Sequence, residues 1–227
     1  MEFKFPHTPH LAWLGSGSPR ADKVLSPSEA HQFLSTPIVV EEKVDGANIG
    51  IYLDPSGTLR VKNRGTVLRP GSHPQFQALW PWLAQRYGSL REALAGHLAL
   101  FGEWCFAVHS VRYRNLPDYF IAFDVYDRGA GEFWSAARRD EWAQSLDIVT
   151  VPVVATGRFT ISKLERLLSS LPSRFGDQPA EGLYLRKDKD GWLESRAKMV
   201  RPEFVQAIGK HWTKRALEEN LLSQAAK

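Results

Sequence analysis

The sequence has few of the features that mark secreted and membrane-spanning proteins. Cys105 is the only cysteine among 227 residues, which excludes an internal disulfide and a zinc site built from several cysteines. No apolar run reaches about 18 residues, the length of a transmembrane helix, and residues 1–10 lack the apolar core of an export signal. Repeats and low-complexity tracts are also absent. We therefore expect a cytoplasmic protein that does not associate with a membrane.

The overall composition is that of an ordinary globular protein. Hydrophobic residues make up 43% of the chain and charged residues 24%, and the length suffices for one large domain or two small ones. No linker-like stretch divides the chain, so we expect one domain. The formal net charge of +4 suits an anionic partner such as a nucleotide or nucleic acid. A solvated surface that happens to be basic explains the same charge equally well.

The stretch 41–50 places a lysine and a glycine between two apolar segments. Residues 37–40 and 49–53 are predicted to be strands, and Lys43-Val44-Asp45-Gly46 lies between them. Gly46 allows a tight turn or a close approach of the backbone to a ligand. A lysine at such a place can bind a phosphate or, when deprotonated, act as a nucleophile. Either role needs partners from elsewhere in the chain.

The rest of the chain alternates short strands with capped helices. Turn sequences predict hairpins at 54–57 and 188–191, and capping boxes predict helix starts at Ser26, Ser89 and Ser162. Further strands are expected at 58–64, 98–106, 119–126, 148–154, 181–186 and 191–198, and further helices at 76–86 with a kink or break at Pro81, at 135–146 and at 203–223. Short turns make the strands mainly antiparallel. The pattern predicts an α+β fold with two mainly antiparallel sheets around a cleft and flanking helices.

Charged residues interrupt or border several of the expected strands. They are Lys43, Arg64, Glu103, Glu181, Arg196 and Lys198. Burying such groups costs free energy unless they pair with each other, with a metal or with a ligand. Cations and carboxylates that meet at strand ends suit a nucleotide phosphate and its divalent metal.

Six short motifs occur in order along the chain. They are Lys43-Val44-Asp45-Gly46, Lys62-Asn63-Arg64-Gly65, Phe101-Gly102-Glu103-Trp104, Phe120-Ile121-Ala122-Phe123-Asp124, Glu181-Gly182-Leu183-Tyr184-Leu185-Arg186 and Arg196-Ala197-Lys198. The set resembles the covalent nucleotidyltransferase superfamily of polynucleotide ligases and mRNA capping enzymes over residues 38–200. The most similar branch is the ATP-dependent RNA ligases of the RNA ligase 2 and editing-ligase type. Six ordered motifs are far more specific than one, and they imply the ATP-grasp-like adenylation fold of the ligases.

The resemblance implies an ATP-dependent RNA ligase. Lys43 would attack the α-phosphate of ATP to form a lysyl-adenylate, and cations such as Arg64 and Lys198, with a divalent metal, would favour its neutral form. Arg196 and Lys198 would contact the nucleotide. AMP would pass to the 5′-phosphate end of an RNA, and a 3′-hydroxyl end would then displace it. Asn48 would act in this end-joining step.

The resemblance also implies residues for adenine and for the metal, Mg²⁺ or Mn²⁺. Phe123 would stack on adenine, and Glu42 would help to hold it, partly through its backbone. Asp45, Glu103 and Glu181 would hold the metal, mainly through its waters, and Glu103 would also serve the ribose. Taken singly, each residue has a simpler interpretation, such as core packing for Phe123 or a structural ion pair for Glu103.

The chain departs from the family pattern in three places. Asn63 stands where the second motif usually has its arginine, and Arg196 replaces a lysine in the last motif. Only about thirty residues follow Lys198, too few for the oligonucleotide-binding barrel of DNA ligases and capping enzymes. We therefore expect residues 1–200 to form the nucleotidyltransferase domain and residues 201–227 a short helical extension of it.

Other functions remain open. A DNA-nick ligase or an RNA guanylyltransferase would use the same motifs, and an RNA-end or nucleotide-binding module without turnover would keep only the binding residues. For an RNA ligase in repair, the family implies a partner that heals ends, a kinase or a phosphatase. The C-terminal segment offers either a phosphate-binding strip or a helix packed on the domain. The strip would contain Arg201, Lys210, His211, Lys214 and Arg215, and the packed face Phe204, Ile208 and Trp212.

Overall fold

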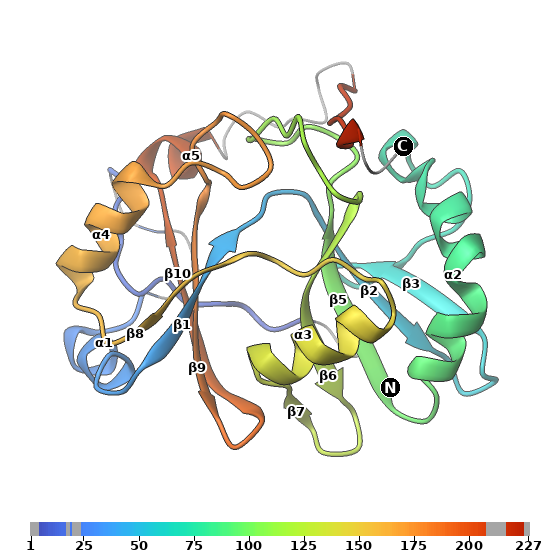
Figure 1. Cartoon of the computed structure of the whole chain (residues 1–227), viewed down its shortest axis with the longest axis horizontal. Helices are drawn as coiled ribbons and strands as arrows, with labels where there is room; N and C mark the ends of the chain where they lie inside the picture. The colour runs from blue at the N-terminus through green and yellow to red at the C-terminus, as the bar shows by residue number, and fades with distance from the viewer. Residues whose placement is uncertain (1–4, 17–18, 20–23, 208–216, 225–227) are drawn as a thin grey trace.

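A computed structural model of the chain describes residues 5–16, 19, 24–207 and 217–224. In this part of the chain two antiparallel sheets stand side by side, with helices on their outer faces (Figure 1). The first sheet contains β10 (Trp192–Val200), β9 (Gly182–Lys189), β1 (Ile38–Lys43) and β8 (Val153–Gly157), in that order. The second contains β4 (Thr66–Val67), β3 (Leu59–Asn63), β2 (Ala47–Leu53), β5 (Leu98–Trp104), β6 (Phe120–Asp127) and β7 (Glu132–Phe133). The expected α+β fold with two antiparallel sheets is confirmed.

Helices α1 (Pro27–Phe33) and α4 (Ile161–Ser170) cover the outer face of the first sheet, and α2 (Leu79–Ala93) covers that of the second (Figure 1). The described residues also form α3 (Ala136–Ser145) and α5 (Pro202–Ala207), with a 3₁₀ turn at Pro74–Phe76. One core cluster joins α1 and α4 to the first sheet, and another joins α2 to the second sheet. A third cluster lies between the sheets and contains Val44, Phe101 and Phe123. None of the helices in the described residues has both the length and the apolar character needed to cross a bilayer.

Local sequence signals explain several elements directly. Ser26 caps α1 through a complete capping box with Glu29, as the sequence predicts. The β9–β10 hairpin turns at Asp190-Gly191, where both residues have positive φ (52° and 82°). Arg64-Gly65 makes a similar turn between β3 and β4, with φ of 45° and 130°. Two-residue turns of this kind match the twist of the flanking strands.

Several predicted boundaries are wrong. Pro81 neither kinks nor ends α2, because it lies in the first turn, where its missing N–H needs no partner. The helix expected at Ser89 is therefore the second half of α2. The cap of α4 is Thr160 instead of Ser162. Residues 148–152 precede β8 and run beside β6, where Ala122 N–H donates to the Val149 carbonyl (2.8 Å).

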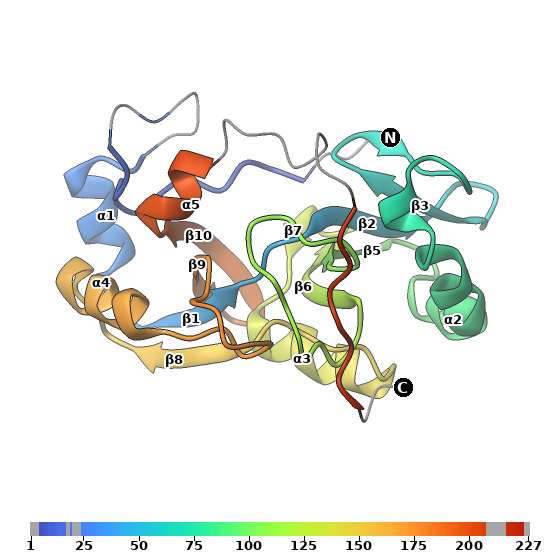
Figure 2. The ribbon, with the colours of Figure 1, turned by 90° about the horizontal axis from the view of Figure 1, so that it is seen from above.

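The described part of the C-terminal segment is not the helix that the sequence predicts. Residues 217–223 are extended along the loop 105–116 (Figure 2), so the helix expected through residue 223 is wrong there. Phe204 packs against the cluster between the sheets as expected, whereas residues 208–216, which carry most of the basic strip, lie outside the described residues. At the other end, Leu11 N–H donates to the Lys198 carbonyl (2.8 Å).

Candidate active site

The register of the first sheet gathers polar side chains on its inner face. Lys43 is opposite Gly182, Glu41 is opposite Tyr184, and Tyr184 is opposite Lys198. Directly opposed residues of neighbouring strands point to the same face. Lys43, Glu41 and Lys198 therefore share a face that is turned toward the second sheet, while apolar side chains of the same strands pack under α1 and α4.

The second sheet presents its own site residues across the gap. Asn48 of β2 is opposite Glu103 of β5, so both side chains point to one face. Between β5 and β6, Phe101 pairs with Asp124 but Gly102 pairs with Ala122, which leaves Phe123 without a partner. Such a β-bulge bends the strand and redirects a side chain, and bulges are frequent beside active sites.

Lys43 forms an ion pair with the Oε2 oxygen of Glu181. Burial alone would lower the pKa of Lys43, but the negative charges of Glu181, Asp45 and Glu103 outweigh burial and raise the pKa above its ordinary value. The sequence predicts that nearby cations favour the neutral amine. The shift has the opposite direction, because the charges that act on Lys43 are those of the carboxylates. These charges therefore favour the protonated form of Lys43.

The two glutamates beside Lys43 are also perturbed. Burial raises the pKa of Glu103 to about 8, against the opposing charges of Lys43 and Arg64. Burial likewise raises the pKa of Glu181 to about 7, against the opposing charge of Lys43. The Oε2 oxygen of Glu103 is buried and has no hydrogen-bond partner among the described residues. A buried acceptor without a donor costs free energy, so this oxygen indicates a position where a ligand binds.

Asp45 is hydrogen-bonded to the loop 105–116. Its Oδ2 oxygen accepts hydrogen bonds from the backbone N–H groups of Ser110 (2.5 Å) and Val111 (3.1 Å). Its own N–H donates to the hydroxyl oxygen of Tyr113 (2.7 Å). No group of three or more His, Cys, Asp or Glu side chains within the described ranges forms a ready-made metal site. Asp45 thus acts on Lys43 through its charge while holding the 105–116 loop.

Gly46 is explained by a close backbone approach. A Cβ atom at this position would lie 2.8 Å from the Trp104 carbonyl oxygen, which is shorter than real Cβ contacts allow. The residue is therefore small because β5 passes directly beside it. The absence of a side chain brings the turn after Lys43 against the strand that carries Glu103.

Glu42 points away from Lys43. Its carboxylate accepts hydrogen bonds from the Ser173 hydroxyl (2.6 Å) and from the Arg174 N–H (2.8 Å). Burial raises the pKa of Glu42, and these hydrogen bonds oppose the shift. Neighbouring residues in a strand point to opposite faces, so the Glu42 side chain holds the loop before β9. Only its backbone borders the face of Lys43.

A buried charge network holds the Phe123 backbone. The Phe123 carbonyl accepts hydrogen bonds from Nη1 of Arg139 (2.6 Å) and Nη1 of Arg186 (3.2 Å). Arg139 also donates to Glu41 (2.6 Å), and Arg186 to Asp124 (2.6 Å). The side chains of all four charged residues are 0% exposed. The six motifs do not predict this network, although Glu41, an acidic residue next to the apolar run of β1, is a signal for it.

Arg196 belongs to the same network. Its Nη1 donates to Asp124 (2.8 Å), and its guanidinium lies 3.9 Å from the centre of the Phe133 ring. Arg196 therefore joins the two sheets, and its charge is already paired in this structure. The positive charge of Lys198 acts on Glu181, where it opposes the raised pKa of that carboxyl group.

His109 is a further polar residue that the sequence analysis missed. Its Nε2 atom lies 3.1 Å from Gln75 Oε1, and the ring is hydrogen-bonded to the Gly46 backbone. Burial lowers the pKa of His109, and the charges of Arg64 and Lys43 add to this shift. Nothing in the local sequence marks this residue, because only the fold of the 105–116 loop brings it to Lys43.

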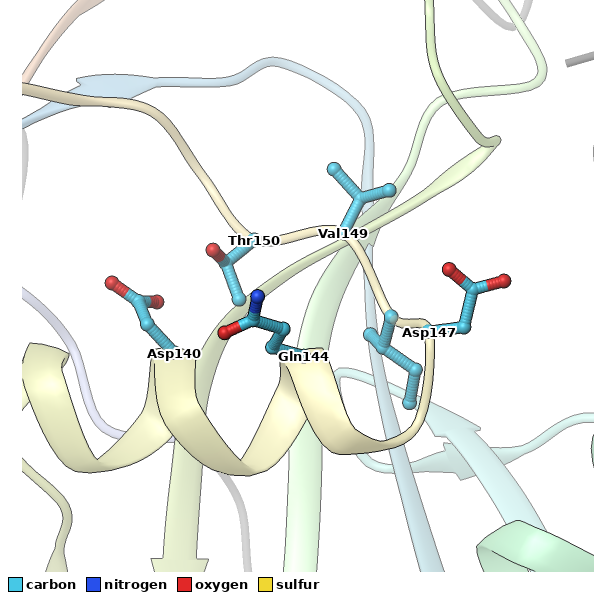
Figure 3. Close-up of a pocket in the computed structure, with 6 residues that line it drawn as sticks. Asp140, Gln144, Asp147, Val149 and Thr150 are labelled. Atoms are coloured by element: carbon cyan, nitrogen blue, oxygen red, sulfur yellow. The ribbon is translucent and has the colours of Figure 1, made fainter. Parts of the chain in front are cut away.

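A shallow hollow lies elsewhere on the molecule. It has a volume of about 330 Å³ and lies between the end of α3 and the segment that leads to β8 (Figure 3). Its lining residues are Asp140, Gln144, Asp147, Ile148, Val149 and Thr150. None of the expected site residues lines it, so we do not assign it to the site around Lys43.

Solved structures with the same fold include several of the RNA ligase of Naegleria gruberi. The structure with pyrophosphate has a TM-score of 0.62 and 19% identity, over 93% of this chain and 60% of the ligase chain. A variant with ATP and Mn gives 0.60 and 21%, over 78% and 53%, and a variant with AMP and Mn gives 0.60 and 19%, over 90% and 63%. The chain thus spans about three fifths of the ligase, and the likeness confirms the expected nucleotidyltransferase fold.

Sequence comparison identifies the family. No curated protein sequence matches the chain. The family model described as RNA ligase matches residues 36–200, a range that contains all six motifs and every residue of the site around Lys43. Since this match covers well over half of the chain, the protein belongs to the RNA ligase family.

Proposed function

We propose that the chain is an ATP-dependent RNA ligase that forms a lysyl-AMP intermediate at Lys43 and joins RNA ends in repair. AMP passes to a 5′-phosphate end, and a 3′-hydroxyl end then displaces it. The observation that carries the proposal is the position of Lys43, paired with Glu181 and facing a second sheet where a buried oxygen of Glu103 has no donor. Membership of the RNA ligase family supports it.

The residues around Lys43 fit a nucleotide with a divalent cation. The raised pKa values of Glu103 (about 8) and Glu181 (about 7) show two buried carboxyl groups that a cation would stabilise as carboxylates. When bound, ATP supplies the phosphorus that is attacked, and Mg²⁺ or Mn²⁺ withdraws charge from its phosphates. Glu103 and Glu181 would hold the metal, mainly through its waters. Asp45 would contribute its charge, since Oδ2 already accepts two hydrogen bonds.

Lys43 must lose a proton before it attacks. The carboxylate of Glu181 is hydrogen-bonded to Nζ of Lys43 and is the nearest acceptor for that proton. In this structure the negative charges around Lys43 hold the proton on the amine. Any positive charge that compensates Glu103 and Glu181 lowers the pKa of Lys43 and so favours its neutral amine. Lys43 Nζ then bonds to the α-phosphorus as the bond to pyrophosphate breaks.

The other site residues take the roles that their positions allow. The bulge directs Phe123 into the gap between the sheets, where it would stack on adenine beside the Glu42 backbone. Arg64 and Lys198 would bind phosphates, and Asn48, opposite Glu103, would act in end joining.

Arg196 would support the nucleotide site through Asp124. We also propose that residues 1–200 act as one nucleotidyltransferase unit and that residues 201–227 extend it.

Self-adenylation tests the proposal. The purified protein incubated with Mg²⁺ and ATP labelled at the α-phosphate should gain an acid-stable label on Lys43. The Lys43→Ala variant should gain none. Lys163→Ala removes an exposed lysine of α4, outside the site, and should label as the wild type does. Absence of label in the wild type, or its persistence in Lys43→Ala, contradicts the proposal.

Strand joining tests the substrate. The labelled protein should join RNA strands that carry a 5′-phosphate and a 3′-hydroxyl, and it should prefer ATP to GTP. Sealing of DNA nicks alone, or labelling by GTP alone, would instead indicate a DNA-nick ligase or a guanylyltransferase. If the protein adenylates itself but joins only ends that a kinase or phosphatase has treated, an end-healing enzyme is its natural partner.

A further inference from the structure

The C-terminal segment 217–223 runs beside the loop 105–116, and both views show the two side by side (Figures 1 and 2). Backbone hydrogen bonds connect them along most of this length. These are Val108 N to Glu218 O (2.8 Å), Asn220 N to Phe106 O (2.9 Å), Leu221 N to Tyr113 O (3.0 Å), Leu116 N to Leu221 O (3.0 Å) and Ser223 N to Leu116 O (2.8 Å). The segment is therefore an integral part of the loop structure.

Asn220 is the buried centre of this contact. It is 1% exposed, and its Nδ2 group donates to the carbonyls of Cys105 (2.8 Å) and Ala107 (3.2 Å). Its Oδ1 oxygen accepts a hydrogen bond from the Tyr113 N–H (2.7 Å). One asparagine thus satisfies three backbone groups of the loop, and its removal would leave all three unpaired in a buried place.

The same loop holds the turn that follows Lys43. The Tyr113 hydroxyl accepts the Asp45 N–H (2.7 Å), while Asp45 Oδ2 accepts the N–H groups of Ser110 and Val111. Tyr113 is therefore the connecting residue, with its backbone on Asn220 and its phenol on Asp45. Hydrogen bonds therefore connect Asn220 to Asp45 through Tyr113, and Asp45 follows Lys43 by two positions in the chain.

We propose that Asn220 is a positioning residue for the adenylation of Lys43, acting through Tyr113 and Asp45. This inference rests on the proposed function, because adenylation is the reaction that it modulates. The residues assigned to adenine and ribose, Phe123 and Glu103, lie on the second sheet outside the path. Loss of Asn220 should therefore slow the attack by Lys43 more than it weakens the binding of ATP.

Three variants of the full chain separate this path from a general loss of stability. Asn220→Ala removes the three hydrogen bonds, and Tyr113→Phe removes only the oxygen that touches Asp45. The double variant combines both changes. Leu221→Ala is the matched control, because its side chain is 51% exposed in the same segment and Asn220 is kept.

The rate of Lys43 labelling is measured as a function of ATP concentration, together with thermal unfolding of each variant. Small misplacements of a reacting group cost up to about a hundredfold in rate, so we expect a fall of roughly ten- to a hundredfold for Asn220→Ala at saturating ATP. The KM for ATP should change by less than about threefold, and Leu221→Ala should match the wild type. The double variant should be no slower than the slower single variant, because both changes interrupt one path.

The outcomes distinguish the inference from the proposed function. If the wild type gains no label, the proposed function fails, and this inference fails with it. If the wild type is labelled but a folded Asn220→Ala reacts at the wild-type rate, the inference alone is wrong. A higher KM with an unchanged maximal rate would also overturn it, as would multiplication of the two single effects in the double variant. Should Asn220→Ala not fold, Tyr113→Phe still tests the path, and a wild-type rate for this folded variant would refute it.

Discussion

Replacing Arg139 with glutamine tests the buried charge network that joins the two sheets. The guanidinium donates to Glu41 (2.6 Å), to the Phe123 carbonyl (2.6 Å) and to Asp140 (2.8 Å). Glutamine is too short to replace all three hydrogen bonds. In Arg139→Gln the fully buried carboxylate of Glu41 loses its closest cation and keeps only Arg186, at 4.0 Å.

The expected loss of stability is large. Removing one partner of a buried ion pair costs about 3–5 kcal/mol, because the other charge stays buried without compensation. In a protein of this size each kcal/mol lowers the melting temperature by about 2–4 °C. Arg139→Gln should therefore melt roughly 6–20 °C below the wild type at neutral pH.

The pH dependence of this loss has a definite sign. Burial raises the pKa of Glu41 above its ordinary value of 4.5, and Arg139 is the strongest opposing influence, so the variant raises that pKa further. A carboxyl group with a raised folded-state pKa contributes stability below its unfolded pKa, and this contribution is lost as the pH rises through the folded pKa. The stability of Arg139→Gln should fall with rising pH by at most about 1.4 kcal/mol per pH unit.

Urea unfolding at pH 5 and pH 8 measures both effects. The double variant Glu41→Gln/Arg139→Gln should recover part of the stability and lose the added pH dependence, since no carboxyl group remains at position 41. Arg138→Gln is the matched control, because Arg138 is partly exposed and lies over the Trp134 ring. If Arg139→Gln unfolds within about 1 kcal/mol of the wild type at both pH values, the network does not carry the stability assigned to buried pairs.

Three further changes test the site itself. Glu181→Gln removes the ion-pair partner of Lys43 and should lower the pKa of that amine. The pH dependence of the reaction between Lys43 and an amine reagent measures this pKa. An unchanged midpoint of the pH curve would contradict the ion pair. Phe123→Ala should raise the KM for ATP roughly tenfold, because base stacking contributes about 1–3 kcal/mol; an unchanged KM would exclude stacking. Gly46→Ala puts a Cβ atom 2.8 Å from a β5 carbonyl and should slow labelling, whereas Gly88→Ala in open space should not; equal rates would exclude the close approach.

The sequence predicts the parts of the fold that depend on local chemistry. Capping residues and two-residue turns act within a few positions, so Ser26 and Asp190-Gly191 identify their elements correctly. Alternation along one strand also places Arg196 and Lys198, two positions apart, on one face. The α2 helix shows the limit of such rules, since the effect of Pro81 depends on where the helix begins.

Long-range pairing explains what the sequence could not predict. Residues 217–223 are rich in Leu and Glu, which favour helices, yet they are extended because the loop 105–116 offers backbone partners and a buried place for Asn220. The direction of the Glu42 side chain depends in the same way on Ser173, which is remote in sequence. His109 reaches Lys43 only through the fold of its loop. In each case tertiary contacts decide between locally acceptable structures.

Tertiary contacts, which local sequence rules do not predict, also decide the charge state of Lys43. Counting charges along the motifs suggests a lysine among cations, but the contacts place Glu181, Asp45 and Glu103 around its amine and raise its pKa. These contacts favour the protonated form of the amine, which is not nucleophilic. Burial is the main reason why Glu181 and Glu103 have pKa values of about 7 and 8, and the neighbouring carboxylates add to it. Under the proposed function, cation binding and activation of Lys43 would therefore depend on one local balance of charge, and the site would react only with both nucleotide and metal bound.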